Sequence, residues 1–457
     1  MIDSPHTQPA PPRDTPAKKS KGARGREGFG TLTNRFIQEI DSLAQTIPLA
    51  MISIGGAHKT ALDSFTTHID QFGLDKDSNA GTVSIPVDHW LRFQALKRRV
   101  DRTAAAQVLV PRSFLVALVS QYDAFLGRLI QAILVVKPEI LNASEKVLKF
   151  SELLTFGTVD AARDHFIEKE IETVLRRSHA EQFEWLEGVF GGPLRKELTV
   201  WPIFIELTER RNLFVHTGGQ VSGQYLATCT KHGVDCTNAE RGSALTVSPA
   251  YFQKSYEAVF EIGVKLAHVF WRKLRPDERE LADGNLNSLT YDLIVDQKFE
   301  LAKCLLDFAL DVLKTHASAE HRLRFAINRV QAHKWSGDHG TATALLDKED
   351  FSALGFQYQL AEAVLRDNFA RAYSIIEQMG KAGPLTLGDY REWPLFQEIR
   401  KETKFDEAIL RIFGEPLNKV FIDPRRDESV SGSSALAAGD AEEDVPDSGD
   451  GTDANSL

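Results

Sequence analysis

Apolar side chains recur every three or four positions along most of this chain, a spacing that predicts helices rather than strands. In the N-terminal part, the helices expected from this pattern cover residues 32–49, 60–72 and 88–106. We expect Pro48 to end the first of them, and Gly55 and Gly56 to lie in the loop that follows. A polar stretch over 75–82 predicts a second loop. Together these features predict an N-terminal helical region over residues 29–107.

The strongest helical pattern runs from Ser113 to Val136, and Pro111 is suited to a position near its start. This helix is apolar on more than one face, which is typical of a helix at the centre of a bundle. Asp123 interrupts the apolar surface, and a buried carboxylate needs a partner such as an arginine or a backbone N–H group. Further helices are expected over 148–154, 160–178, 180–190, 201–216 and 251–271, with loops over 219–243 and a short strand near 245–247. The chain is therefore expected to be all-α, with a helical bundle over 108–275.

Beyond this bundle the pattern changes to short paired helices. Three segments share an aspartate shortly before an alanine that opens an apolar helix; they are 296–302, 338–342 and 367–372. Their alanines are 40 and 30 residues apart, close to the repeat length of helix–turn–helix solenoids. The pattern resembles an irregular tetratricopeptide-like array over residues 285–415. Such arrays offer a surface for a protein partner rather than a catalytic centre.

Charge and composition indicate that both ends of the chain are disordered. Residues 1–28 are rich in proline and basic side chains, and we expect a disordered basic arm. Residues 427–457 carry nine acids and no Lys or Arg, which predicts a disordered acidic tail. These acids account for nearly all of the net charge of −10, so the remaining chain does not exclude an anionic partner. A basic helix face over 92–102 is expected to be solvated, with contact to nucleic acid as the alternative.

Composition also bears on the cellular compartment. Asp123 and Arg128 interrupt the most apolar stretch, so we expect no membrane span. The N-terminal residues lack the apolar core of a secretory signal. Three cysteines cannot form a disulfide framework, which fits a reducing compartment. We therefore expect a cytoplasmic protein.

Other motifs in the chain favour ordinary structural roles. Cys229, His232 and Cys236 have the spacing of metal ligands, but no fourth ligand is evident nearby, and we expect no metal site. The glycines of 188–192 lack the Lys-Ser/Thr pair of a phosphate-binding loop, and we expect no cofactor. His179 lies on a predicted helix and is expected to face solvent or to pack.

The stretch 206–219 carries the chemistry of greatest interest. Arg210, Arg211, Asn212 and His216 lie within two turns of a predicted helix that ends at Gly218-Gly219. Cleavage of RNA without a metal requires a base for the ribose 2′-OH, stabilisation of the phosphorane charge and an acid for the leaving oxygen. Histidine can transfer these protons and an arginine fork can hold phosphate oxygens. Asparagine can fix either group by hydrogen bonding, and positions 212 and 216 are i, i+4 neighbours.

A single histidine is too few for a reaction that needs both an acid and a base. A symmetric dimer supplies the second one if the two motif helices meet at a two-fold axis. Two arginines and two histidines would then converge on one phosphate. We therefore expect a homodimer that forms through this helix and an RNA partner.

The motif Arg211-Asn-Leu-Phe-Val-His216 resembles the R-[N/D/H]-x3-H signature of the HEPN superfamily (higher eukaryotes and prokaryotes nucleotide-binding). The stretch 118–126 resembles that family's early helix, in which an acid often lies near the motif. The resemblance covers roughly residues 108–272. The sequence of residues 209–219 is similar to that of family members found in prokaryotic defence and toxin systems.

This resemblance implies a helical bundle that pairs through the motif helices. It also implies metal-independent endoribonuclease activity that leaves a 2′,3′-cyclic phosphate. Arg211 would bind the phosphate, His216 would be the acid and base, and Asn212 would support both. Asp123 would orient the arginine or the histidine, and Arg210 is a second supporting residue.

Three alternatives stay open. In a purely structural interpretation Arg211 pairs with Glu206 or Asp123, and His216 stabilises the C-terminus of its helix. In a second, the chain is a non-catalytic RNA-binding or protein-interaction scaffold with an inactive HEPN dimer module. In a third, it takes part in nucleotidyl transfer with a partner, although no transferase motif occurs in the sequence.

Overall fold

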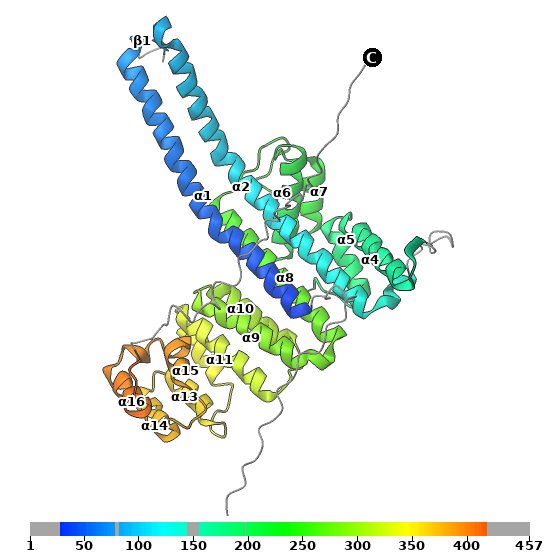
Figure 1. Cartoon of the computed structure of the whole chain (residues 1–457), viewed down its shortest axis with the longest axis vertical. Helices are drawn as coiled ribbons and strands as arrows, with labels where there is room; N and C mark the ends of the chain where they lie inside the picture. Colours follow the sequence, from blue (N-terminus) through cyan, green and yellow to red (C-terminus); the bar gives the residue numbers. More distant parts are fainter. Residues whose placement is uncertain (1–27, 78–81, 144–154, 197, 418–457) are drawn as a thin grey trace, which may run out of the picture. The chain divides into compact units, whose positions relative to one another are not determined.

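The computed structural model describes residues 28–77, 82–143, 155–196 and 198–417 (Figure 1). Regular structure in these residues is almost entirely helical, so the predicted all-α class is confirmed. The expected basic arm, the expected acidic tail and the helix predicted over 148–154 lie outside the described residues.

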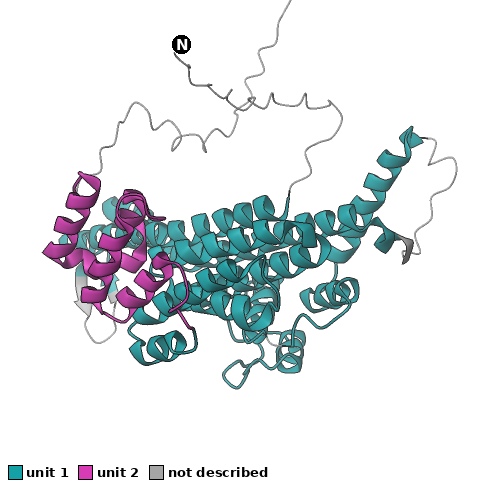
Figure 2. Ribbon diagram, turned by 90° about the horizontal axis from the view of Figure 1, so that it is seen from below, with its two compact units in different colours: residues 1–349 teal, residues 350–457 magenta. Residues whose placement is uncertain are grey.

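The chain forms two compact units that divide between Glu349 and Asp350 (Figure 2). This division lies inside the range 285–415, over which the sequence predicts one repeat region. The helices that follow residue 275 therefore belong to the first unit as far as residue 349. The predicted domain boundaries themselves remain predictions.

Two long helices, α1 (Phe29–Phe72) and α2 (Val87–Val136), form a hairpin in the first unit. They contain 44 and 50 residues and so extend about 65 to 75 Å at 1.5 Å per residue. The strands β1 (Leu74–Asp77) and β2 (Thr82–Ser84) pair antiparallel at the tip of this hairpin. Figure 1 shows that the hairpin extends well beyond the other helices of the unit.

Four predictions for this region are wrong. Pro48 and Pro111 lie inside continuous helices, and Gly55 and Gly56 also lie within α1. A proline removes one backbone hydrogen bond and a helical glycine costs about 1 kcal/mol relative to alanine. The contact between α1 and α2 along their length outweighs these local costs. The loop expected over 75–82 is wrong at its two ends, because residues 75–77 belong to β1 and Thr82 begins β2.

Helix α2 also bears on the expectation of a protein without a membrane span. It is the one helix in the described residues that is long and apolar enough to cross a membrane. Of its most apolar 18-residue window, 22% is buried. Core helices of proteins without a membrane span have the same composition, so this is weak evidence for a span.

The other helices in the described residues of the first unit follow in sequence order. They are η1 (Pro138–Ala143), α4 (Val159–Leu175), α5 (His179–Phe190), α6 (Trp201–His216), α7 (Gly223–Lys231), α8 (Pro249–Leu274), η2 (Pro276–Glu278), α9 (Arg279–Val295), α10 (Phe299–Asp307), the π-helical turn η3 (Phe308–Val312), α11 (Ala319–Trp335) and α12 (His339–Leu346). The loop predicted over 219–243 is wrong at α7, and near 245–247 the described residues hold only an isolated bridge between Gln220 and Ala244. Helix α7 forms because Ser222 caps it and Tyr225 and Cys229, one turn apart, are buried.

Helices α1, α2 and α8 approach one another closely in the core of the first unit. The ring of Phe36 stacks on Phe125 with 4.2 Å between the ring centroids. Gly263 of α8 faces the same ring, and a Cβ atom there would lie 2.1 Å from Cε1 of Phe36. Only glycine permits this approach of the two helices. All three residues are interior, and they fix α8 against the hairpin on the side where α6 also packs.

The second unit contains short helices. They are α13 (Phe356–Leu365), α14 (Phe369–Met379), α15 (Leu387–Glu392), η4 (Pro394–Phe396), η5 (Ile399–Lys401) and α16 (Thr403–Phe413). Its interior holds aliphatic side chains and a cluster of aromatic ones, which includes Tyr390, Phe396 and Phe405. It carries one of the three segments that the sequence pattern groups together.

The three segments contain the same turn between two helices. Gln297, Gly337 and Asp367 each have a positive φ angle, of 59°, 89° and 57°. In each case the next backbone N–H bonds a carbonyl five residues earlier, at 2.8 to 2.9 Å. The alanine five positions after each turn residue is buried. The similarity of the segments is therefore local and geometric, and the resemblance to tetratricopeptide arrays remains a prediction.

Candidate functional site

Helix α6 carries the predicted Arg–His motif. Its observed bounds, Trp201–His216, are those that the sequence pattern predicts. Pro202 lies in its first turn, and Phe204 and Leu207 anchor it in the core. The first half of α6 is therefore fixed in the core, and the motif lies in the last two turns of the helix.

The end of α6 is held by backbone and arginine contacts. Gly218 and Gly219 have φ angles of +64° and +90°, which an L-residue rarely adopts. The N–H of Gly219 bonds the carbonyl of Leu213 at 3.0 Å. Arg112 of α2 donates to the carbonyl oxygen of Gly218 at 2.9 Å and lies over the ring of Phe214. These contacts fix the position of the residues just before the Gly-Gly stop.

Asp123 of α2 joins Arg211 to a histidine that sequence reasoning missed. Its Oδ2 accepts a hydrogen bond from Nη2 of Arg211 at 2.6 Å, and its Oδ1 accepts one from Nε2 of His179 at 2.9 Å. The side chains are 31%, 20% and 7% exposed for Asp123, Arg211 and His179. One carboxylate therefore bridges a buried imidazole and a partly accessible guanidinium.

His179 is the first residue of α5, and its position has a local cause. Ser178 and Glu181 form a reciprocal capping box that starts the helix there. The capping box is readable in the sequence, but it does not reveal the partner of His179. Asp123 lies 56 residues earlier, and the contact depends on how α5 packs near α2.

Glu209 adds a second carboxylate beside this cluster. Burial raises the pKa of Glu209, and the nearby His179 and Arg211 oppose that rise. The neighbouring Tyr122 is fully buried, and its pKa is raised well above its usual value by burial and by the charge of Asp123. The site thus combines one arginine, one histidine and two acids from α2, α5 and α6.

Arg210 belongs to a different network. It donates to Glu206 at 2.7 Å and to the carbonyl of Thr246 at 2.8 Å, and its guanidinium stacks 3.9 Å from the ring centre of Tyr251. The buried Glu206 also accepts hydrogen bonds from the hydroxyls of Tyr225 and Tyr251. These contacts tie α6 to α7 and α8. Within one chain they place Arg210 away from the contact between Asp123 and Arg211.

Asn212 and His216 lie on the accessible side of α6. Asn212 is half-buried and His216 is exposed. Among the described residues no side-chain hydrogen bond is present for either one, and none joins Arg211 to His216. At 100° per residue, Arg211, Val215, Asn212 and His216 fall within an arc of about 140°. The motif therefore forms one face of the helix, and Val215 is 52% exposed on it.

Of the three residues with metal-ligand spacing, Cys229 lies in α7, His232 caps it and Cys236 follows it. Within the described parts of the chain no group of three or more His, Cys, Asp or Glu side chains is arranged to hold a metal ion. Nδ1 of His232 instead accepts a hydrogen bond from the indole of Trp201 at 3.3 Å. Burial raises the pKa of Cys229 to about 12, so its thiol stays protonated.

No protein-family model, no curated protein and no solved structure matches this chain. The roles of Arg211, Asn212, His216, Asp123 and Arg210 therefore rest on the motif and on the contacts described above.

Proposed function

We propose that this protein is a metal-independent endoribonuclease of HEPN type. The observation that carries the proposal is the accessible face of α6. There Asp123 holds Arg211 at one edge, while Asn212 and His216 hydrogen-bond to no described side chain. Such a face offers an arginine and a histidine to a phosphate without a metal ion.

In the proposed reaction, Arg211 binds the scissile phosphate. Asp123 engages Nη2, and Nη1 is directed to a phosphate oxygen. His179 holds the other carboxylate oxygen of Asp123 and acts as a positioning residue. The preorganised guanidinium neutralises the charge that develops on the phosphorane.

The proton transfers require a second copy of the chain. Neutral His216 removes the proton from the ribose 2′-OH, and the oxygen attacks phosphorus. Protonated His216 of the partner subunit donates a proton to the leaving 5′-oxygen, so that proton gain and loss balance. The products are a 2′,3′-cyclic phosphate and a 5′-hydroxyl. The exposed Val215 on the same face fits a contact between two copies of α6.

The proposal includes a place in a prokaryotic defence or toxin system and a cytoplasmic location. Both follow from the resemblance of the motif and from the composition of the chain. The paired helices with their common turn at Gln297, Gly337 and Asp367 are proposed to bind a protein partner that controls the nuclease.

One observation favours the alternative of a non-catalytic RNA-binding module. The 2.6 Å contact with Asp123 offsets the charge of the arginine that should hold the phosphate. In this alternative the pair mainly stabilises the bundle, and RNA binds without being cut. The two functions differ in whether the parent protein cleaves RNA and whether that cleavage depends on His216.

The test is cleavage of labelled single-stranded RNA in EDTA by the full chain. Arg211→Ala and His216→Ala are compared with Arg241→Ala and His339→Ala, which remove exposed side chains of the same types elsewhere. We expect a loss of at least about 100-fold in both motif variants and little change in the controls. Undiminished cleavage by both motif variants would exclude the catalytic assignment. RNA binding without cleavage by the parent protein would support the alternative.

A further inference from the structure

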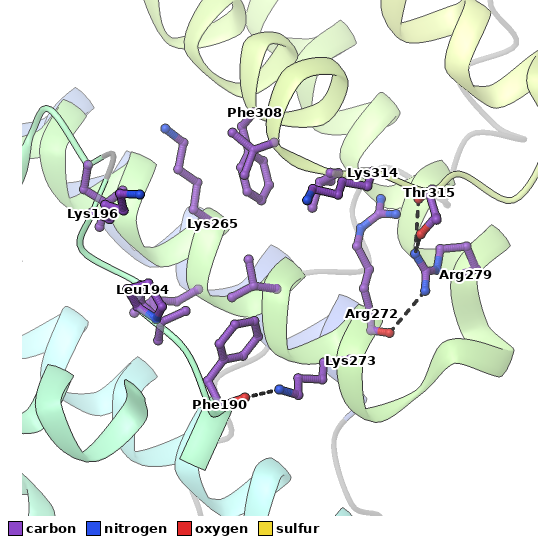
Figure 3. A pocket seen from close by; sticks show the side chains of 16 residues that line it. Phe190, Leu194, Lys196, Lys265, Arg272, Lys273, Arg279, Phe308, Lys314 and Thr315 are labelled. Carbon is purple, nitrogen blue, oxygen red and sulfur yellow. Dashed lines mark hydrogen bonds between the residues drawn. The ribbon is translucent and has the colours of Figure 1, made fainter. Parts of the chain in front are cut away.

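A pocket of about 540 Å³ lies in the first unit, away from the motif face of α6. It is formed by the C-terminal half of α8, the end of α5 with the loop after it, and the segment that continues from η3 (Figure 3). Its volume is that of a site for a small organic molecule. The proposed nuclease chemistry does not use it.

The lining of this pocket combines apolar and cationic side chains. Phe190, Leu266, Val269 and Phe308 contribute apolar surface. Six of the sixteen lining residues are lysine or arginine, and no aspartate or glutamate is among these described residues. Two of these six cations are ion-paired with acids outside the lining, Lys265 with Glu261 and Arg272 with Asp283, and the other four form no ion pair among the described residues. This composition indicates a ligand with an apolar part and a negative charge.

Arg272 provides an independent observation. Its side chain is only 5% exposed, and it lines the pocket. Nη2 donates to the buried Asp283 at 2.5 Å, but Nε and Nη1 have no hydrogen-bond partner among the described residues. Buried donors of a charged group are normally paired. An anionic group in the pocket would pair with them.

Arg279, Lys273 and Lys314 are among the other cations that line the pocket. Arg279 and Lys273 are held by hydrogen bonds, and Lys314 is available to bind a ligand. Arg279 donates to the backbone oxygen of Thr315 at 3.1 Å and also bonds its hydroxyl. Lys273 donates to the backbone oxygen of Phe190, and its ammonium lies 4.2 Å from the centre of that ring. Lys314 is exposed, and no ion pair of its side chain is present among the described residues. Arg279 and Lys273 are therefore held in place at the pocket, and Lys314 is an exposed lining cation.

We propose that this pocket binds a small organic anion with an apolar body and a phosphate or carboxylate head group. The head group contacts Arg272, Arg279 and Lys314, and the body lies against Phe190, Val269 and Phe308. A metal ion is disfavoured by the six cations. A nucleobase would need neutral hydrogen-bonding side chains, and the one such side chain in the lining, Thr315, already bonds Arg279. The proposal is independent of the ribonuclease activity.

The test is isothermal titration calorimetry of the full chain with octyl phosphate. Octanoate tests the carboxylate head group. Octanol, which has only the apolar body, and inorganic phosphate, which has only the head group, are the controls. We expect saturable binding of one octyl phosphate or octanoate per chain, and at least about tenfold weaker binding of octanol and phosphate. Absence of saturable binding by both amphipathic anions, or equal binding of octanol, would overturn the proposal.

Substitutions locate the binding site. Lys314→Glu reverses an exposed charge, and Val269→Phe fills the pocket, whereas Arg272→Gln would leave Asp283 buried without its partner. We expect at least about tenfold weaker binding in Lys314→Glu and loss of binding in Val269→Phe. Lys254→Glu, at an exposed position near the other end of α8, is the control and should bind normally. Binding that Lys314→Glu leaves unchanged would overturn the assignment, and the melting temperature of each variant shows that it is folded.

Discussion

Asp123 and Arg211 are joined by a 2.6 Å hydrogen bond although 88 residues separate them in the chain. The same carboxylate holds His179, so α2, α5 and α6 meet at one partly exposed acid. This contact fixes the arginine of the motif at the edge of an accessible helix face. It can serve catalysis by orienting Arg211 or serve the fold by linking helices, and substitutions distinguish these contributions.

Asp123→Asn should lower both stability and cleavage. The substitution keeps the shape of the side chain but removes the ion pair, and we expect a loss of about 1–2 kcal/mol because both partners are partly exposed. Cleavage should fall by about 10- to 100-fold because Arg211 is no longer oriented. The measurement is a double-mutant cycle of unfolding free energies with His179→Asn. The combined loss should be smaller than the sum, since both substitutions break the same hydrogen bond.

Glu209→Gln should stabilise the protein at neutral pH but not in acid. Burial raises the folded-state pKa of Glu209, so the folded protein favours the protonated carboxyl more than the unfolded chain does. Its favourable contribution is present below the unfolded-state pKa of about 4.3 and is lost as the pH rises through the folded-state pKa. Thermal unfolding at about pH 7.5 should therefore show a higher melting temperature for the variant, and unfolding near pH 4 should show no gain. Glu168→Gln, at an exposed position on α4, is the control, and equal stabilisation at both pH values would contradict this account.

Val215→Glu should separate the proposed dimer. Val215 is 52% exposed on the motif face, so the substitution costs the monomer little but places like charges across a two-fold contact. Ile203→Glu is the matched control, because Ile203 is 39% exposed on the same helix about 120° away around its axis. Sedimentation velocity should show a monomer for Val215→Glu and a dimer for Ile203→Glu. A parent protein that is monomeric at high concentration would refute the dimer.

Gly219→Ala should destabilise the end of α6 more than Gly218→Ala does. Both positions have positive φ angles, which cost an L-residue about 1–2 kcal/mol. At Gly219 a Cβ atom would also lie 2.8 Å from the Phe214 ring, whereas at Gly218 nothing lies within 4 Å. Chemical denaturation should therefore give a loss of about 1 kcal/mol at Gly218 and a clearly larger loss at Gly219. Equal losses would mean that Phe214 moves away freely.

Periodicity predicted those features of the chain that local sequence determines. The bounds of α6 and the interior position of the second half of α2 follow from apolar spacing and from Pro202. The turns at Gln297 and Asp367 lie in two of the segments that share an aspartate shortly before an alanine. These features depend on residues a few positions apart.

The sequence-based predictions that are wrong or incomplete share one physical cause, which is contact between residues distant in the sequence. Pro48 and Pro111 normally break helices, but here the paired helices support each other across both prolines. His179 packs against Tyr122 and Phe204, which is one of its two expected positions, but its hydrogen bond to Asp123 is not predictable because that partner is distant in sequence. The hydrogen-bond network around Glu206 and Arg210 is also not predictable from local sequence, because Tyr225 and Tyr251 belong to α7 and α8. Local patterns cannot specify contacts of this kind.

The most direct test of the central claim is the chemistry of the products. Single-stranded RNA is incubated with the full chain in EDTA, and the ends of the fragments are identified by mass spectrometry. The account predicts 2′,3′-cyclic phosphate and 5′-hydroxyl ends, formed at least about 100-fold more slowly by His216→Ala. Fragments with 3′-hydroxyl ends, or the same rate of cleavage by His216→Ala, would contradict it.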